Sequence, residues 1–208
     1  MDIIHEDQLA ISVLISYLKS INTLSEGLIS LYRQYCKVMR IRKNKYILSP
    51  VDNNQYLYFI VHGTARGFIK DEGIEITTCF AFENEMMAAM REPQEHINYS
   101  PEYLHALENC LIVCIPYALI EENSTDFPEL NFISRQLLAL QSFYAAQRSI
   151  LARIPKAADR YKKVLLDERF KLSPIPLRYL ASYLSIRLET LSRIRRKETD
   201  ALLSLASA

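Results

Sequence analysis

Apolar residues recur at helical spacing near both ends of the chain and at every second position in between. Over residues 7–36 they form two runs, at Leu9, Val13, Ile15 and Leu18 and then at Leu28, Leu31 and Tyr32. This spacing is typical of amphipathic helices on the surface of a domain, and Ser25 is suited to cap the second helix.

The pattern changes to alternation over residues 37–116. Strand-like segments lie at residues 56–63, 65–70, 74–80 and 103–116. Between the second and third segments, Asp71-Glu72-Gly73 supplies a turn whose glycine tolerates a positive φ, which predicts a hairpin. Short strands at close intervals predict a roll or barrel of antiparallel strands.

A further helical pattern covers residues 127–155 and has the spacing of a heptad repeat. Its seam positions recur at alternating steps of four and three, at Ile133, Leu137, Leu140, Tyr144, Gln147, Leu151 and Ile154. Such a seam fits either a helix that lies on its own domain or a parallel helix pair that holds a homodimer, with Gln147 fixing the register. We favour the homodimer. Pro155 cannot continue the helix and marks the end of this segment.

Residues 174–197 contain two short helical patterns separated by a break. Pro176 stands at the start of the first pattern, where a missing N–H costs nothing. The apolar positions are Leu177, Leu180, Ala181 and Leu184 in the first pattern and Leu191 and Ile194 in the second. Two helices that cross closely at a small residue such as Ala181 are typical of a helix–turn–helix.

The second of these helices carries a charged row on its outward face. Glu189, Arg193 and Arg196 fall at i, i+4 and i+7. Arginine can hold guanine O6 and N7 with two hydrogen bonds, glutamate can accept from cytosine N4, and Thr190 and Lys197 suit phosphates. A Glu–Arg pair four residues apart can also serve only to stabilise its own helix. The row is therefore the candidate surface for reading bases.

Positive charge is concentrated in the same part of the chain. The sequence has 25 basic and 24 acidic residues, so the net charge is only +1. Residues 156–198 hold twelve basic and five acidic residues, a net charge of +7, so the rest of the chain carries −6. This polarisation favours a polyanion-binding region joined to an unrelated domain, although a solvated basic surface would give the same count.

The remaining residues argue against catalysis, metal binding and membrane insertion. The four cysteines form no CxxC pair, and alternation puts Cys110 and Cys114 on one strand face with Ile112, so buried free thiols are expected rather than a metal or redox pair. No Ser/His/Asp, Cys/His or carboxylate pair has usable spacing, so the protein is not expected to be an enzyme. The acidic start and the lack of an apolar run of roughly 18 residues favour a cytoplasmic location away from membranes.

Two stretches resemble the Crp/Fnr family of bacterial transcription regulators. "YLASYLSIRLETLSRIRRK" (residues 179–197) is similar to the family's recognition motif, and "YLYFIVHGTARGFIKDEGIEITTCFAFENE" (residues 56–85) is similar to its cyclic-nucleotide-binding-type β-roll. The resemblance covers nearly the whole chain in the family's order. It implies an α+β protein with an antiparallel, jelly-roll-like sensor domain and N-terminal helices over residues 1–126, a long dimerisation helix over 127–155 and a small helix–turn–helix domain over 156–208.

The resemblance also implies a function. The protein would be a transcription regulator that binds a roughly palindromic double-stranded DNA site as a homodimer, with RNA polymerase as a further partner. Glu189 and Arg193 would read bases and Thr190 would touch phosphate. The full set expected to contact DNA is Arg178, Arg187, Glu189, Thr190, Ser192, Arg193, Arg196 and Lys197. The alternative is a ligand-binding or scaffold protein whose degenerate helix–turn–helix no longer binds DNA.

The effector site departs from that of family members that bind cyclic AMP. Those members carry a Gly-Glu pair and a later arginine that hold the ribose and the cyclic phosphate, whereas this chain has Ala88-Ala89 and no arginine around Ser100-Pro101-Glu102. A buried phosphate without a cation loses its charge-assisted hydrogen bonds, and a nearby carboxylate repels it. A cyclic nucleotide is therefore not expected. The effector is either another small molecule, of unknown identity, or absent.

The sequence does not predict an iron cofactor either. Cys36 has no neighbouring cysteines with which to share an iron–sulfur cluster. His62, His96 or His105 could supply a haem ligand, although a structural role is more usual for such histidines. No cofactor or metal is therefore assigned.

The recognition motif and the segment after it also depart from the family. Arg187 replaces the usual Ser or Thr cap, Leu188 replaces a frequent base-reading arginine, and Ser185 replaces the common turn glycine. A lost cap costs about 1 kcal/mol. The residues after Lys197 do not resemble the β-hairpin wing of the family, so weaker or more partner-dependent DNA binding is expected.

Overall fold

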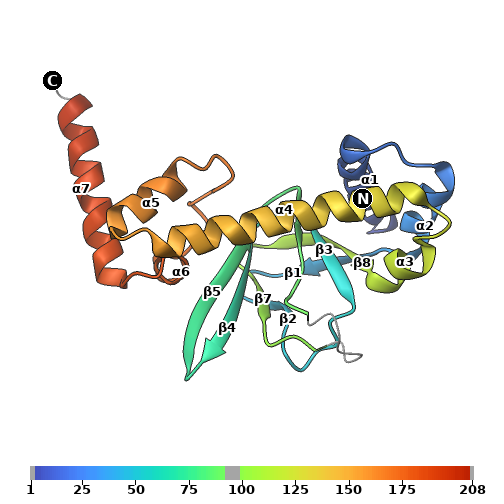
Figure 1. Cartoon of the computed structure of the whole chain (residues 1–208), viewed down its shortest axis with the longest axis horizontal. Helices are drawn as coiled ribbons and strands as arrows, with labels where there is room; N and C mark the ends of the chain where they lie inside the picture. The colour runs from blue at the N-terminus through green and yellow to red at the C-terminus, as the bar shows by residue number, and fades with distance from the viewer. Residues whose placement is uncertain (1–2, 92–98, 207–208) are drawn as a thin grey trace.

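The chain folds into a β-roll beneath one long helix, with further helices at both ends of that helix (Figure 1). The structure is a computed structural model and describes residues 3–91 and 99–206. The helices are α1 (Ile3–Ile21), α2 (Glu26–Tyr35), α3 (Tyr117–Asn123), α4 (Pro128–Arg153), α5 (Ala157–Leu165), α6 (Leu177–Tyr183) and α7 (Leu188–Ala206). The strands are β1 (Lys37–Ile41), β2 (Tyr46–Leu48), β3 (Tyr56–His62), β4 (Ala65–Asp71), β5 (Ile74–Ala81), β6 (Glu85–Met87), β7 (Tyr103–Ala106) and β8 (Cys110–Pro116). The predicted α+β fold is confirmed.

The strands form two four-stranded antiparallel sheets, with the orders β1-β8-β3-β6 and β2-β7-β4-β5. The predicted hairpin joins β4 to β5, and Asp71 pairs with Ile74 across its turn. Glu72 and Gly73 make the turn with φ values of 47° and 82°. Glycine suits the second position because a β-carbon disfavours such angles.

Strand β8 shows how the roll is packed. Ile112 and Cys114 point into the space between the two sheets, whereas Val113 and Ile115 belong to the apolar layer shared with α1 and α2. None of the four is more than 2% exposed. The sheet that contains β8 is therefore covered on both faces.

The cysteines are free thiols, and the prediction that they are buried is confirmed for Cys36, Cys110 and Cys114. Burial raises the pKa of Cys110 to about 11 and that of Cys36 and Cys114 to about 12. The reactive thiolate is therefore scarce at neutral pH. Cys79 is half-buried and lines a cavity described below.

Helix α1 packs one apolar face against the roll. The buried positions are Ala10, Ile11, Leu14, Ile15 and Leu18. Leu9, which the sequence places on the same face, is 57% exposed, so that part of the prediction is wrong. The row Ala10–Leu14–Leu18 faces the sheet, and Leu9 lies about 100° around the helix from Ala10. The predicted cap of α2 is confirmed, because the Ser25 hydroxyl accepts from Leu28 N–H at 3.3 Å.

Helix α4 connects the two ends of the molecule (Figure 1). It begins beside α2 and α3 and ends beside α5 and α6. Its first turn is held by the Glu129 carboxylate, which accepts from the Ser25 backbone N–H at 3.2 Å and from the Ser25 hydroxyl at 2.6 Å. Over residues 3–91 and 99–206, none of the helices combines the length and apolarity that a bilayer crossing requires.

Candidate nucleic-acid interface

Helices α6 and α7 form the predicted helix–turn–helix. Pro176 lies directly before α6, where its missing N–H removes no hydrogen bond from the helix. The facing side chains are buried, at Leu180, Ala181, Leu184 and Leu191. Small Ala181 is 3% exposed and lies where α6 meets the turn, and its carbonyl accepts from Ile186 N–H at 3.0 Å.

The turn between α6 and α7 lacks the glycine that such turns commonly contain. Ser185 occupies the left-handed region with a φ of 53°, a conformation that costs a residue with a β-carbon roughly 1–2 kcal/mol. Arg160 of α5 steadies the turn, because its Nη1 donates to the carbonyls of Leu184 and Ser185 at 3.0 Å each. Its Nε donates to the Ile154 carbonyl at 2.7 Å. One guanidinium thus ties the turn to the residue that follows α4.

Helix α7 presents the candidate row on its exposed side. Glu189 and Arg193 are exposed, whereas Leu191 is fully buried against α6. Among the ion pairs of the described residues, none joins Glu189 to Arg193. The other predicted DNA contacts are also exposed, at Arg178, Arg187, Ser192, Arg196 and Lys197, while Thr190 is half-buried. Glu189 and Arg193 are therefore not engaged in the intrahelical pair that would explain them without DNA.

The surface of α7 has a shallow depression of about 370 Å³. It is lined by Thr190, Arg193, Ile194, Arg196 and Lys197. Beyond this depression, residues 198–206 continue α7 as a helix. This segment therefore does not form the wing of the family, in line with the sequence.

The residues predicted for the dimer seam differ in how far they are exposed. Ile133 and Leu151 are buried, Leu137, Tyr144 and Ile154 are half-buried, and Leu140 and Gln147 are exposed. Ile133 and Leu151 are 1% and 7% exposed within a single chain and belong to the protomer's own core. Tyr144 lies 3.8 Å, measured to its ring centroid, from the Arg169 guanidinium. Much of this seam therefore faces the roll and the C-terminal helices.

A second heptad row, one residue earlier along α4, faces outward. It consists of Phe132, Gln136, Ala139, Phe143, Ala146 and Ile150, all of them exposed. Phe143 and Ile150 are 55% and 51% exposed, which is unusual for large apolar side chains on a helix that also has a buried face. We call this set the outer seam of α4.

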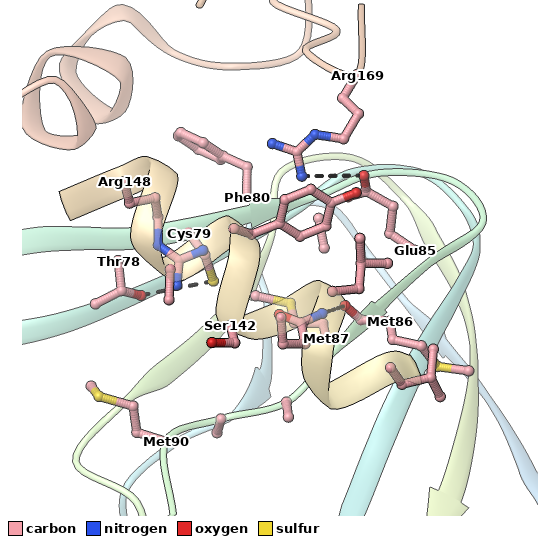
Figure 2. A pocket seen from close by; sticks show the side chains of 18 of the residues that line it. Thr78, Cys79, Phe80, Glu85, Met86, Met87, Met90, Ser142, Arg148 and Arg169 are labelled. Carbon is pink, nitrogen blue, oxygen red and sulfur yellow. Dashed lines mark hydrogen bonds and ion pairs between the residues drawn. The ribbon is translucent and has the colours of Figure 1, made fainter. Parts of the chain in front are cut away.

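A cavity of about 710 Å³ lies where the roll, α4 and the C-terminal helices meet (Figure 2). Its largely apolar walls come from β5, from residues 84–90, from α4 between Leu137 and Arg148, and from Phe170 and Tyr183. Small-molecule sites in proteins commonly measure about 300–1,000 Å³. The cavity therefore has the size of a ligand site and touches the helix–turn–helix directly.

Four charged side chains line this cavity, Glu85 and Arg169 as an ion pair at 3.6 Å, and Glu102 and Arg148. Glu102 is 3% exposed, and its carboxylate accepts from the Thr78 hydroxyl and from Met90 N–H, the latter at 2.8 Å. Burial raises the pKa of Glu102 above its ordinary value. Arg148 enters from α4 near Thr78 (Figure 2). These charged groups give a largely apolar cavity several points of polar recognition.

The cavity brings together residues that the sequence singled out separately. Ala88, Ala89 and Glu102 all line it. Arg148 was missed, because nothing in the spacing of α4 shows which of its residues meets the roll. The long helix thus places one cation in the cavity lining, and the loop between α5 and α6 places a second, Arg169.

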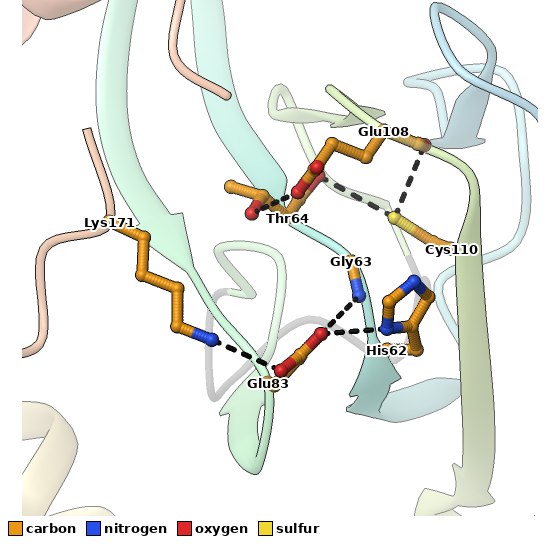
Figure 3. A network of polar contacts seen from close by, with 7 residues as sticks. All are labelled: His62, Gly63, Thr64, Glu83, Glu108, Cys110 and Lys171. Carbon is orange, nitrogen blue, oxygen red and sulfur yellow. Dashed lines mark hydrogen bonds and ion pairs between the residues drawn. The ribbon is translucent and has the colours of Figure 1, made fainter. Parts of the chain in front are cut away.

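The histidines lie away from the cavity lining, as far as the structure describes them. His62 is a surface residue whose Nδ1 lies 2.7 Å from a Glu83 oxygen (Figure 3). His105 is buried beside Arg66, and its pKa is lowered first by burial and then by that arginine. His96 lies outside the described residues. In residues 3–91 and 99–206 no group of three His, Cys, Asp or Glu side chains could hold a metal ion.

The chain has the fold of Crp/Fnr regulators, as comparison with solved structures shows. Its sequence matches no protein-family model and no characterised protein. FixK2 from Bradyrhizobium japonicum superposes with a TM-score of 0.67 over 80% of this chain and 85% of that chain, at 19% identity. The c-di-GMP responsive global regulator CLP from Xanthomonas campestris superposes with a TM-score of 0.66 over 85% of this chain and 93% of that chain, at 14% identity. A protein from Eubacterium rectale that is assigned to the Crp/Fnr family of transcriptional regulators superposes with a TM-score of 0.66 over 86% of this chain and 85% of that chain, at 18% identity.

Proposed function

We propose that this protein is a transcription regulator, not an enzyme, and that it binds double-stranded DNA through α7. The observation that carries the proposal is the division of α7 into two sides. Leu191 fixes one side against α6, while Glu189 and Arg193 stand exposed on the other with no ion pair between them. CLP links signalling to gene expression, and the E. rectale protein is assigned as a transcriptional regulator, which supports the same role for this fold here.

The chemistry of the row suits the major groove. Arg193 would hold a guanine through two hydrogen bonds, and Glu189 would accept from a cytosine amine, each good pair being worth about 1–3 kcal/mol of discrimination. Lys197, Arg187 and Arg178 would neutralise phosphates and set the position of α7 on the duplex. Because residues 198–206 extend α7, contacts of this kind must replace those of a wing.

We further propose a homodimer held by the outer seam of α4. Two copies packed along this seam would bury Phe132, Phe143 and Ile150 and would place two α7 helices on successive major grooves, about 34–36 Å apart. Phe143→Glu should give a monomer in sedimentation, because it sets two carboxylates against each other. Its DNA affinity should fall by roughly 100-fold or more, as two linked contacts become one.

Phe143→Leu is the matched control, because it keeps the seam apolar and should remain a dimer. A monomeric wild-type protein, or a Phe143→Glu protein that is still a dimer, would contradict the outer seam.

The effector is proposed to be a small molecule other than cyclic AMP. Glu102 lies in the cavity wall with two donors already bound, and of the two arginines in the lining, Arg148 and Arg169, the second is paired with Glu85. CLP responds to c-di-GMP, but a cavity lined by the carboxylates of Glu85 and Glu102 is poorly suited to a ligand with two phosphates. RNA polymerase and a cytoplasmic location belong to this proposal on the strength of the family resemblance.

One observation favours a second function. Residues 198–206 are helical, whereas a wing directly after the recognition helix would add backbone contacts. A ligand-binding or scaffold protein that uses the helix–turn–helix to contact protein would have the same feature.

The two functions are separated by selecting binding sites from a pool of random duplexes and titrating the selected duplex at several salt concentrations. A regulator should enrich a roughly palindromic site, and its affinity should fall steeply with salt as counterions are released. Equal affinity for selected and random duplexes, with no salt dependence, would leave the scaffold as the explanation.

A further inference from the structure

Strand β5 is the edge strand of its sheet, and α6 covers that edge. The Ser182 hydroxyl accepts from Thr77 N–H at 2.9 Å and donates to the Glu75 carbonyl at 3.0 Å. One side chain of the helix–turn–helix thus takes both backbone groups that a further strand would otherwise bond. This contact fixes α6 relative to the roll.

Arg66 of β4 reinforces the contact. Its side chain is fully buried, and its guanidinium carbon lies 3.7 Å from the Tyr179 ring centroid and 4.4 Å from that of Phe68. Its Nε donates to Thr77 Oγ1 at 2.9 Å, and its Nη1 pairs with Glu75 at 2.8 Å. The Thr77 hydroxyl in turn donates to the Tyr179 carbonyl at 3.2 Å. A buried cation is costly without its partners, so this arrangement is sensitive to small displacements.

The other side of β5 forms a wall of the cavity. Thr78 lines the cavity, and its hydroxyl donates to Glu102. The pairing of β4 with β5 shifts register between Gly67 and Phe68, which leaves Thr78 as the extra residue of a β-bulge. Thr77 and Thr78 are neighbours, so any backbone movement at the bulge is shared by the contact with α6 and by the cavity.

A second set of contacts joins the roll to the loop between α5 and α6. The Glu83 carboxylate pairs with Lys171 Nζ at 3.0 Å and lies 2.7 Å from His62 Nδ1 (Figure 3). Arg169 of the same loop pairs with Glu85 at 3.6 Å near the mouth of the cavity (Figure 2). Water and salt screen such partly exposed pairs. They support the docking of the helix–turn–helix, to which the buried contact at β5 and the apolar packing of α6 on Phe80 and Phe82 contribute more.

We define the β5 clamp as Arg66, Glu75, Thr77, Tyr179 and Ser182. We propose that this clamp couples the cavity to the recognition helix within one protomer, an inference that rests on the proposed function. A small molecule that breaks the hydrogen bond between Thr78 and Glu102, or that packs against this wall of the cavity, displaces the bulge. Because Thr77 is hydrogen-bonded to Ser182 and Tyr179, the displacement also moves α6. Because α6 packs on α7, the exposed row turns relative to α4. Arg66, Thr77 and Ser182 are positioning residues, and none of them belongs to the row.

The first test fills the cavity from the opposite wall. Ser142 lines the cavity from α4, and Ser149 lies one heptad later, exposed and outside the lining. Ser142→Trp should speed hydrogen exchange of the Thr77 amide by roughly ten-fold, whereas Ser149→Trp should leave it unchanged. Ala145→Phe, on the same wall, serves as a second variant if Ser142→Trp does not fold. Unchanged exchange at Thr77 in a folded variant of either kind would overturn the proposal.

The second test measures affinity for the selected DNA site in a double-mutant cycle. Ser142→Trp should change that affinity by roughly five-fold or more, and Ser182→Ala should abolish the response, while the loop substitution Ser173→Ala should preserve it. Additive effects of Ser142→Trp and Ser182→Ala would overturn the coupling. If the protein prefers no duplex, the proposed function is wrong. Hydrogen exchange at Thr77 then still tests whether the cavity is coupled to the β5 clamp.

Discussion

The β-roll and the helix–turn–helix keep their structures in different ways. The roll is packed on both faces of one sheet, and core residues such as Phe59 and Ile112 are fully buried. The helix–turn–helix has a first helix of 7 residues and a serine in the left-handed region at its turn. It is held in place by Arg160, by the β5 clamp and by an apolar cluster shared with Phe80 and Phe82 of the roll. The β-roll is therefore stabilised by its own core, whereas the helix–turn–helix is positioned by contacts with neighbouring elements.

This difference has an energetic meaning for regulation. Burying one large apolar side chain contributes about 1.5–3 kcal/mol, whereas a typical hydrogen bond contributes about 0.5–1.5 kcal/mol net. The polar contacts of the β5 clamp are therefore within reach of one ligand, whereas the core of the roll is not. Helix α6 also packs on the roll through an apolar cluster that includes Phe80, Phe82 and Leu180. A rigid roll beside a helix–turn–helix that one ligand can shift is what the proposed function requires.

The largest expected effect tests the rigidity of the roll. Ile112→Ala should lower the free energy of unfolding by about 2–5 kcal/mol, because it leaves a cavity between the two sheets. Ile74→Ala is the matched control at a site that is 67% exposed, and it should cost less than about 0.5 kcal/mol. Urea unfolding measures both values. Similar costs at the two sites would mean that the roll is loosely packed.

A smaller effect of opposite sign is expected in the helix–turn–helix. Ser185→Gly should raise the free energy of unfolding by about 0.5–1 kcal/mol, because glycine adopts the left-handed conformation without strain. The same change at Ser192, an exposed position inside α7, should lower it by about 1 kcal/mol. Thermal unfolding of both variants checks the reversal of sign. Two destabilised proteins would show that Ser185 is not strained.

The smallest expected effect concerns pH at the boundary between the two regions. The folded state raises the pKa of Glu102, mainly through burial, and so binds its proton more tightly than the unfolded state does. This contribution to stability is full below the ordinary glutamate pKa of about 4.3 and is lost as pH rises through the higher folded pKa. Glu102→Gln removes the effect.

The stability of Glu102→Gln relative to the wild type should therefore increase as pH rises from about 4 to 7. Urea unfolding at several pH values measures the difference, and groups common to both proteins, such as Glu83, cancel. A difference that is constant with pH would show that Glu102 is not desolvated.

Local patterns were sufficient to predict much of this fold. Alternation around Ile112 located a buried strand, the turn at Gly73 located a hairpin, and the break at Ser185 separated α6 from α7. Each of these features depends on residues close in sequence, where periodicity and backbone preference act directly.

The features that the sequence could not determine depend on which way a helix faces. Helix α4 contains two rows of residues with heptad spacing, one that includes Ile133 and one that includes Phe132. Periodicity alone could not show which of the two rows packs against the roll. The same uncertainty placed Leu9 on the wrong side of α1. Arg148 and the contact of Ser182 with β5 join segments far apart in the chain and leave no local pattern. Only the tertiary fold brings them together.

The binding-site profile of Arg193→Ala tests the central claim most directly. In a folded, dimeric variant, preference should relax by about 1–3 kcal/mol at one base pair of each half-site and remain elsewhere, because one bidentate contact is lost. Arg33→Ala, an exposed arginine on α2, should leave the profile unchanged. A profile for Arg193→Ala identical to that of the wild type would contradict base reading by the exposed row of α7.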